Sequence, residues 1–266
     1  MFRFIGMTSI LAMSFLSVIQ VAAQKEAAVV YFTFDENAGN TVTDGSGNGN
    51  DGKINGATWV KGKFGSALEF DAAKKAFVEV SDSPTLNPDK EISYMAWFVS
   101  ESYDNTRGII SKYTGGGNQR SYNLRLHHTI AGALSTEVSA NGAFQLGVST
   151  TDVHSDAVLD DGQWHHAAIT FKGGDFLRMY VDGELVNESD AKVTDTLFDN
   201  ETPMRIGTDF NDEDKRFFNG IIDEVAVFNR VLTQAEIQQA MKGDILAINT
   251  SGKLSTTWGW LKTGRK

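Results

Sequence analysis

Short apolar runs alternate with turn-forming clusters along most of the chain, and this pattern limits the possible folds more than any other feature. The runs include AVVYFTF (28–34), ISYMAWFV (92–99), HHAAITF (165–171) and GIIDEVAVF (220–228), with Gly, Asn, Asp and Ser between them. Runs of this length, rich in β-branched and aromatic residues, are typical of strands. The sequence therefore predicts an all-β protein.

Two segments refine this prediction. ISYMAWFV (92–99) is apolar at both odd and even positions, as expected of a strand buried on both faces. LRMYVDGELV (177–186) alternates instead, and its Asp182-Gly183 pair favours a tight hairpin because both central positions of such a turn need positive φ. Many strands in one domain indicate a two-sheet antiparallel β-sandwich, or jelly roll.

One helix is predicted, near the end of the domain, in VLTQAEIQQAMKG (231–243). Thr233 and Glu236 have the spacing of a capping box, in which each side chain bonds the other residue's backbone N–H. Ile237 and Met241 would share one apolar face, and Gly243 would end the helix. The fold class is thus a β-sandwich with one short C-terminal helix.

The two ends of the chain differ from this domain. Residues 1–23 carry Arg3, an apolar run and Val21-Ala22-Ala23, which together predict a signal peptide cleaved after Ala23. An uncleaved membrane anchor is the rival, but polar residues interrupt the run. Residues 24–243 would form one domain. Residues 244–266 would form a basic tail that contains two tryptophans, and we interpret it as a loosely attached terminus rather than a docking segment.

Net charge and cysteine content restrict the environment and the partners. The formal charge of −10 disfavours nucleic acid and anionic membrane surfaces, which need clustered Lys and Arg. The chain has no cysteine, so an exported protein would be held by its core without disulfides. We expect a secreted, periplasmic or cell-surface protein, with no membrane insertion once the signal is removed.

The segment VTDGSGNGNDG (42–52) allows several interpretations. Its letters match the dinucleotide fingerprint G-x-G-x-x-G, but KINGATWV follows without a helical period, so the helix that would hold a phosphate is missing. It also resembles the start of an EF-hand loop, yet the twelfth position is Asn55 rather than glutamate. A calcium loop of another kind, using oxygens of Asp44, Asn48, Asn50 and Asp51, and a solvated Asn/Gly turn both remain open.

Several motifs together resemble the laminin-G-like jelly-roll domains of the concanavalin A-like lectin and glucanase superfamily. They are YFTFDENAGNTVTDGSGNGNDG, GKFGSALEFD, ISYMAWFV, DGQWHHAAITF, LRMYVDGELV, RIGTD and FFNGIIDEVAVFNRVLTQAEI, in that order. The resemblance implies a two-sheet antiparallel jelly roll. It also implies a calcium ion where the early loop meets a late strand, with Asp44, Asn48, Asn50 and Asp223 as its ligands in this sequence.

Catalytic motifs are weak. A glycosidase needs two carboxylates aimed at one bond, and same-face positions of one strand would supply them. No predicted strand carries such a pair, and Asp223 and Glu224, being adjacent, would face opposite ways. His165 and His166 would diverge for the same reason, which disfavours a zinc site there. We therefore expect a protein that is not an enzyme, with glycoside hydrolysis as the less favoured alternative.

The loop-rich region 101–122 carries the candidate ligand-binding residues, because aromatic and hydrogen-bonding side chains in loops suit sugar recognition. They are Tyr103, Arg107, Tyr113, Asn118 and Arg120. The sequence thus predicts an exported binding module for carbohydrate or another extracellular polymer, stabilised by calcium. A protein-interaction or cell-surface structural module without a sugar site is the alternative, with an extracellular protein as its partner.

Overall fold

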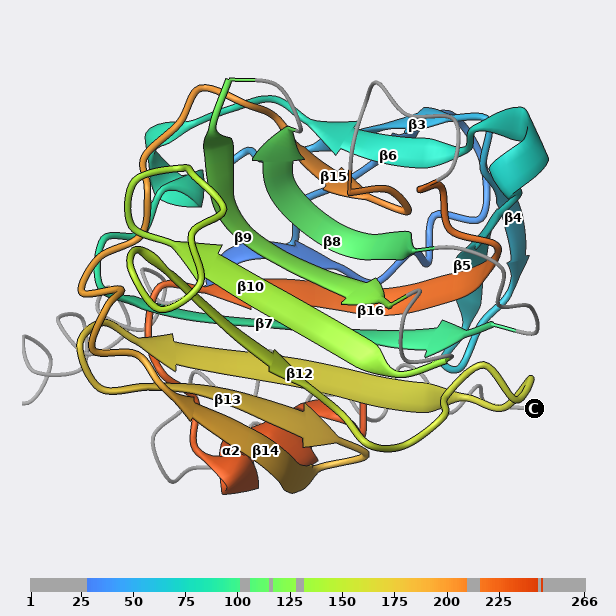
Figure 1. Cartoon of the computed structure of the whole chain (residues 1–266). Helices are drawn as coiled ribbons and strands as arrows, with labels where there is room; N and C mark the ends of the chain where they lie inside the picture. The colour runs from blue at the N-terminus through green and yellow to red at the C-terminus, as the bar shows by residue number, and fades with distance from the viewer. Residues whose placement is uncertain are drawn as a thin grey trace, which may run out of the picture.

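The computed structural model describes residues 28–100, 106–114, 117–127, 132–209, 216–243 and 245, and shows two antiparallel sheets packed face to face (Figure 1). The first sheet has the strand order β14-β13-β12-β7-β16-β5-β4, with β1 paired to β16. Its strands are β1 (Ala28–Phe32), β4 (Thr58–Lys61), β5 (Ser66–Phe70), β7 (Glu91–Val99), β12 (His165–Lys172), β13 (Phe176–Val181), β14 (Glu184–Asp190) and β16 (Gly220–Phe228).

The second sheet has the order β11-β10-β9-β8-β15-β6-β3-β2 and faces the viewer in Figure 1. Its strands are β2 (Thr41–Val42), β3 (Gly52–Asn55), β6 (Phe77–Val80), β8 (Arg107–Thr114), β9 (Gln119–Leu126), β10 (Leu134–Ser139), β11 (Thr150–His154) and β15 (Met204–Ile206). Two 3-10 turns, η1 (Ala72–Lys74) and η2 (Pro84–Leu86), connect strands. The predicted all-β sandwich is confirmed.

Apolar side chains from both sheets fill the space between them. Tyr94 of β7 packs against Tyr122 of β9, with ring centroids 5.4 Å apart, and the Tyr94 hydroxyl donates to the Asn123 carbonyl oxygen. The two rings are fully buried, so they contribute large apolar areas to the core. Because Tyr94 alternates with Met95, which packs on the opposite face, β7 is buried on both sides, as its sequence predicts.

The helix α2 (Gln234–Ala240) covers the outer face of the first sheet, below β13 and β14 in Figure 1. Both halves of the predicted capping box are present: Thr233 Oγ1 accepts from the Glu236 N–H, and Glu236 Oε2 accepts from the Thr233 N–H. Ile237 and Ala240 are buried against this sheet. Within the described ranges, no helix has the length and apolar character needed to cross a membrane.

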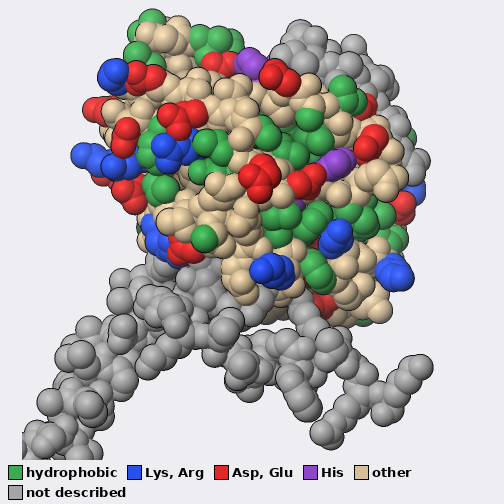
Figure 2. Space-filling view, turned by 90° about the horizontal axis from the view of Figure 1, so that it is seen from below, with side chains coloured by type: hydrophobic (Ala, Val, Ile, Leu, Met, Phe, Trp, Pro, Cys, Tyr) green, Lys and Arg blue, Asp and Glu red, His purple; other side chains and the backbone are tan. Residues whose placement is uncertain are grey.

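The predicted hairpin joins β13 and β14 through Asp182 and Gly183. Their φ angles are +50° and +83°, so both central residues adopt the left-handed conformation that this tight turn requires. β14 is the outermost strand of its sheet and exposes Leu185 and Val186. The face seen from below in Figure 2 mixes hydrophobic side chains with charged ones of both signs.

Candidate functional site

The outer face of the second sheet is polar and nevertheless buried. On β9, Tyr122, Leu124 and Leu126 point into the core, so Asn123 and Arg125 point to the other side. Asn123 is 0% exposed and Arg125 is 8% exposed. Buried polar groups need partners, because desolvation without compensation costs about 1–3 kcal/mol per group. The partners of these buried polar side chains therefore define a candidate site on this face.

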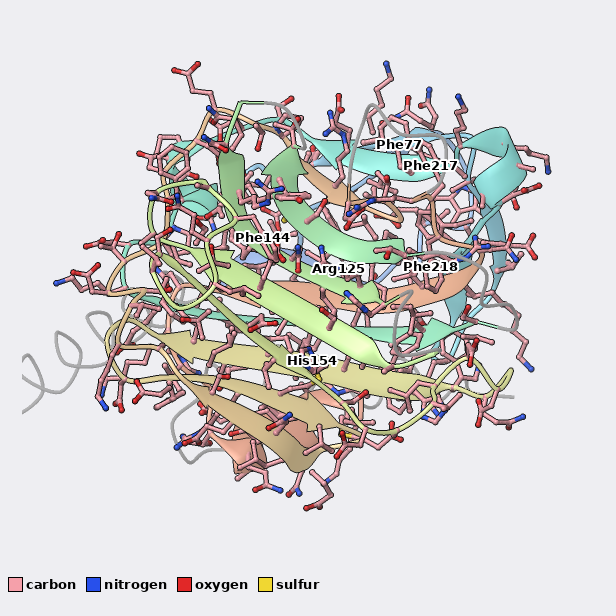
Figure 3. All side chains as sticks on the ribbon, viewed as in Figure 1. Phe77, Arg125, Phe144, His154, Phe217 and Phe218 are labelled. Atoms are coloured by element: carbon pink, nitrogen blue, oxygen red, sulfur yellow. The ribbon has the colours of Figure 1, made fainter. Side chains whose placement is uncertain are left out.

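Arg125 lies between two buried carboxylates at the centre of this face (Figure 3). Its Nη2 donates to Glu137 Oε2 at 2.9 Å, and its Nη1 donates to Asp209 Oδ2 at 3.4 Å. Arg216 Nη1 also donates to Asp209 Oδ2, at 3.2 Å. Glu137 also faces a second arginine, because Arg120 Nε lies 3.5 Å from Glu137 Oε1. These five residues, Arg120, Arg125, Glu137, Asp209 and Arg216, are called the arginine cluster below.

Asp209 reaches this face because the chain after β15 runs directly over β8. A side chain at Gly108 would place its Cβ 2.1 Å from the Asp209 backbone nitrogen, so only glycine permits this approach. Ser111 Oγ donates to the Thr208 carbonyl oxygen at 2.8 Å and fixes the segment. Asp209 is therefore positioned by a contact between residues that are about a hundred positions apart in the sequence.

Several buried polar atoms of this face have no hydrogen-bond partner. They are Asn123 Nδ2, Arg125 Nε, Glu137 Oε1, Asp209 Oδ1 and Ser121 Oγ. Asn123 Oδ1 accepts from the Glu137 N–H at 3.1 Å, which leaves the amide donors of that side chain unused. Unsatisfied buried polar atoms are rare in native proteins, and several on one face indicate a place where a ligand or ordered water supplies the missing partners.

Aromatic side chains border the arginine cluster. The Arg120 guanidinium lies 4.8 Å from the ring centroid of Tyr113 and 5.5 Å from that of Phe144, and its Nε donates to the Tyr113 hydroxyl at 2.9 Å. Tyr113 is buried, whereas Phe144 is 51% exposed and lies on the same face as Arg125 (Figure 3). An exposed ring beside a polar cluster offers both apolar and hydrogen-bonding contact to a ligand.

The electrostatics of the cluster follow from its burial. Burial raises the pKa of Asp209, although Arg125 and Arg216 oppose this rise. Burial alone would lower the pKa of Arg125, but Glu137 and Asp209 outweigh it, and the pKa is raised. The pKa of His127, at the end of β9, is lowered by burial and then by Arg125, His154 and Arg216. Arg125 is therefore held in its charged form, burial favours the neutral form of Asp209, and the arginines act as positive neighbours of His127.

The structure places the predicted ligand residues unevenly. Tyr113 and Arg120 belong to the site just described. Arg107 is buried and its Nη1 donates to the Phe217 carbonyl oxygen at 3.1 Å, whereas Asn118 is exposed in the β8–β9 turn with φ +55°. Tyr103 lies outside the described residues.

Sequence reasoning did not find Asn123, Arg125, Glu137 or Asp209. Polar residues alternating with apolar ones in YNLRL and LSTEV were a signal for the strand residues among them. No sequence pattern signalled Asp209, because its place depends on the path of the chain over β8.

The glycine-rich loop is closed by hydrogen bonds to Asp44. Its Oδ1 accepts from the N–H groups of Tyr31 and Ser46, at 3.1 and 2.9 Å. Its Oδ2 accepts from Ser46 Oγ and from the Asn50 N–H, at 2.7 and 3.1 Å. All four acceptor positions of this carboxylate are therefore occupied by groups of the protein.

The two asparagines of this loop direct their amide donors toward β1. Asn48 Nδ2 donates to the Ala28 carbonyl oxygen at 2.7 Å, and Asn50 Nδ2 donates to the Val29 carbonyl oxygen at 2.9 Å. A calcium ion is bound by oxygens, and these donors are not ligands for it. As arranged, the Asp44 carboxylate has no acceptor position left for a calcium ion, and the amide donors of Asn48 and Asn50 face the backbone of β1.

Asp223 takes part in a different set of contacts. Its Oδ2 accepts from the Phe64 N–H at 3.1 Å and its Oδ1 from the Glu224 N–H at 2.9 Å, so it anchors the β4–β5 hairpin. Burial, with Glu224 and Asp35 nearby, raises its pKa to about 7. Among the residues that the structure describes, no three His, Cys, Asp or Glu side chains gather as metal ligands.

A comparison with protein families agrees with the fold. The model of a family described as the concanavalin A-like lectin/glucanases superfamily matches residues 72–238. No curated protein matches the chain.

Solved structures with the same fold include binding domains. The binding domain of Paraclostridial Mosquitocidal Protein 1 has a TM-score of 0.65 at 14% identity, with 83% of this chain and 53% of that chain covered. The ligand binding domain of botulinum neurotoxin serotype D, in complex with N-acetylneuraminic acid, has a TM-score of 0.62 at 13% identity, with 86% and 53% covered. This chain thus spans about half the length of the toxin binding domains.

A further neighbour matches over nearly its whole length. It is Domain 4 of AbnA, an extracellular arabinanase from Geobacillus stearothermophilus, in complex with arabinotriose. Its TM-score is 0.60 at 18% identity, with 80% of this chain and 97% of that chain covered. At these identities the comparisons establish a shared fold, a lectin-like jelly roll found in binding domains.

Proposed function

Because this chain belongs to the concanavalin A-like lectin/glucanase superfamily, we propose that it binds carbohydrate, without cleaving it, on the outer face of the second sheet. The contact residues we assign are the arginine cluster with Asn123, Tyr113 and Phe144. Two structural neighbours, the neurotoxin D binding domain and the arabinanase domain, were solved with a sugar bound. Those ligands support the class of ligand proposed here.

One observation carries the proposal: unpartnered donors and acceptors lie together on a buried face next to an exposed aromatic ring. Asn123 Nδ2 and Arg125 Nε are donors, and Asp209 Oδ1 is an acceptor. A sugar hydroxyl both donates and accepts, so adjacent hydroxyls would satisfy both kinds of atom once the side chains that cover these buried atoms move aside. The C–H face of the same sugar can pack on Phe144, as ligands pack on the aromatic walls of binding sites.

A glycosidase is the second candidate, because Glu137 and Asp209 lie on one face on either side of Arg125. A glycosidase needs two carboxylates near one bond, and here they come from two different segments instead of one strand. However, both carboxylates already bond the Arg125 guanidinium, and Asp209 bonds Arg216 as well. Protonating a leaving group or attacking a sugar carbon would require them to release these partners, so we favour binding without cleavage.

A protein-interaction module remains the other alternative. The loop between β10 and β11 exposes Phe144, Leu146 and Val148, at 51%, 49% and 69%. Apolar side chains exposed in one loop are a usual feature of protein-binding surfaces. In that case these three residues, rather than the arginine cluster, would form the contact.

Export and a structural calcium ion are further parts of the proposal. The signal-like residues 1–23, which lie outside the described residues, support export. The family resemblance supports calcium, but binding at the predicted loop would require Asp44 to release bonds to Tyr31, Ser46 and Asn50. We therefore assign no functional step to the ion.

The experiment that tests sugar binding is a glycan array with the purified full chain and three variants. Phe144→Ala and Asn123→Ala should weaken any binding, by roughly 2–10-fold for the loss of an aromatic contact of about 0.5–1.5 kcal/mol. Arg178→Ala is the control. Its guanidinium also lies over an aromatic ring, 3.7 Å from the Phe176 centroid, but on β13 of the other sheet. No binding to any plant, algal or host glycan would refute the proposal.

The same samples separate the alternatives. If bound polysaccharide is shortened, and Glu137→Gln or Asp209→Asn stops this, the protein is a hydrolase. If no sugar binds but a protein partner is captured and Val148→Asp abolishes capture, the interaction module is correct.

A further inference from the structure

We infer that a pocket separate from the arginine cluster binds an uncharged sugar unit through its hydroxyl groups and disfavours acidic sugars. It is formed where residues 87–89, before β7, meet Ala140 and residues 196–199, and its volume is about 400 Å³. Pockets of roughly 300–1,000 Å³ are usual for small ligands. This inference rests on the proposed function, carbohydrate binding, and adds a second site with its own selectivity. We call it the second pocket below.

Backbone hydrogen bonds fix the walls of the second pocket. The Leu197 N–H donates to the Asp89 carbonyl oxygen at 2.7 Å, and the Phe198 N–H donates to the Ser139 carbonyl oxygen at 2.8 Å. Segment 196–199 is thus tied both to the residues before β7 and to the end of β10. A site that is already formed needs little ordering when a ligand binds, so less affinity is lost.

Gly142 connects the second pocket to the arginine cluster. It has φ +79°, and a Cβ at this position would lie 2.8 Å from ring atoms of Phe198, so the ring packs directly on the glycine. The Gly142 carbonyl oxygen also accepts from the Arg120 N–H at 3.1 Å. The second pocket therefore lies beside the residues to which sugar binding is assigned above.

Two carboxylates of the second pocket are available to a ligand. Asp89 and Asp199 are both exposed, and within the described ranges neither side chain forms an ion pair or a hydrogen bond. The buried Lys112 interacts with Asp199 only at longer range, because its Nζ donates to Asp82 and to the carbonyl oxygens of Asn200 and Thr202. Each free carboxylate accepts several hydrogen bonds, and those bonds are charge-assisted.

Apolar surface lies beside these carboxylates. Phe198 and Pro88 are partly exposed and line the same pocket. The C–H face of a sugar packs on such surface while its hydroxyl groups donate to the carboxylates. A further acceptor, Asn87 Oδ1, is buried without a partner in the described part of the chain, and a ligand would reach it once the amide turns toward the pocket.

The charge of the second pocket determines which sugars fit. The described residues that line it include two aspartates and no Lys or Arg. A uronic acid or sulfated sugar would bring its negative charge close to Asp89 or Asp199, and like charges repel at short range. The formal charge of −10 on the whole chain adds to this repulsion. A neutral sugar with several hydroxyl donors avoids the repulsion and supplies the hydrogen bonds.

Amide NMR on the ¹⁵N-labelled full chain tests the second pocket, because it reports where a ligand binds. The probes are arabinotriose, galactotriose, mannotriose and cellotriose. We expect at least one of them to shift the amide signals of Ala140, Leu197 and Phe198. The same trisaccharide, oxidised at a primary hydroxyl to a carboxylate, should bind there roughly fivefold more weakly, the factor expected for like charges near contact distance in water.

Variants separate the aromatic contribution from the charge. Phe198→Ala should weaken binding of the neutral trisaccharide roughly 2–10-fold through the lost aromatic contact. Asp199→Asn keeps the size of the side chain and removes its charge, so the discrimination against the oxidised form should fall. Asp195→Asn is the matched control: this aspartate is exposed in the same connection but lies outside the second pocket, and the change should affect neither quantity.

The outcomes distinguish the inference from the proposed function. Shifts confined to the arginine cluster and Phe144 overturn the inference and leave the proposed function intact. Equal affinity of the second pocket for the neutral and oxidised forms, or equal discrimination in Asp199→Asn and Asp195→Asn, also overturns it. Shifts at the second pocket alone support the inference and refute the location of the proposed site. If none of the trisaccharides shifts any amide signal, the inference and the proposed function both fail.

Discussion

Asp44→Ala is the substitution that best tests how the glycine-rich loop is held. The change removes the acceptor of three backbone N–H groups, those of Tyr31, Ser46 and Asn50. Asp44 is 7% exposed, so water can replace these bonds only if the loop opens. A buried donor left without a partner costs about 1–3 kcal/mol. Taking the lower value for three donors gives a loss of roughly 3 kcal/mol in the free energy of unfolding.

Thermal unfolding followed by circular dichroism measures this loss. For a domain of this size, about 1 kcal/mol shifts Tm by roughly 2–4 °C, so we expect a decrease of roughly 6–12 °C. Asp51→Ala is the matched control. It removes the same charge from the same loop but only one hydrogen bond, from the Asp44 N–H, and should lower Tm about a third as much.

Calcium provides the sharpest discrimination. If hydrogen bonds hold the loop, Asp44→Ala lowers Tm equally in excess calcium and in EDTA. If the Tm of the unmodified chain falls in EDTA, and Asp44→Ala removes that dependence, the ion holds the loop and the hydrogen-bond argument is wrong. A variant that melts at the original temperature in both solutions would refute both explanations.

Three other predictions follow from single contacts. Gly108→Ala should displace the segment at Asp209, because the added Cβ would lie 2.1 Å from the Asp209 backbone nitrogen. A crystal structure would show the displacement, and so would a loss of sugar binding in a variant that still folds. Lys112→Met should lower the free energy of unfolding by about 3 kcal/mol, because the fully buried Lys112 Nζ donates to Asp82 and to two carbonyl oxygens. Urea titrations measure this loss, and a loss below about 1 kcal/mol would contradict the prediction. Burial lowers the pKa of His166 to about 3, so the unfolded chain takes up a proton that the folded one does not, and stability falls as pH drops from about 6.5 toward 3. In the His166→Phe variant, the free energy of unfolding should depend less on pH, by up to about 1.4 kcal/mol per pH unit, as measured by urea titrations. An NMR titration of His166 with a midpoint near about 6.5 would contradict the prediction.

Local features of the fold could be predicted because they depend on neighbouring residues. The double-sided apolar run at 92–99, the Asp182-Gly183 turn and the Thr233–Glu236 capping box are each written within a few positions, and the structure shows all three. In each case the deciding physics, namely side-chain alternation, positive φ or a three-residue hydrogen bond, acts over that same short range.

The site could be predicted only in part. The sequence pointed to Tyr113 and Arg120, since aromatic and guanidinium side chains in a loop-rich region suggest binding. It could not show that Arg120 contacts a second ring, because Phe144 comes from the connection between β10 and β11. Hydrogen-bond saturation of Asp44 was equally hidden, since its partners include the backbone of β1.

The sequence alone determined the all-β class, the late helix, the position of the turns and the family to which the chain belongs. Only the tertiary structure decided that Asp209 meets Arg125 across 84 positions, and that Asp223 supports the β4–β5 hairpin rather than a loop near Asp44. The reason is physical: strand pairing order and the close approach at Gly108 arise from the packing of whole sheets, and no local pattern of residues encodes them.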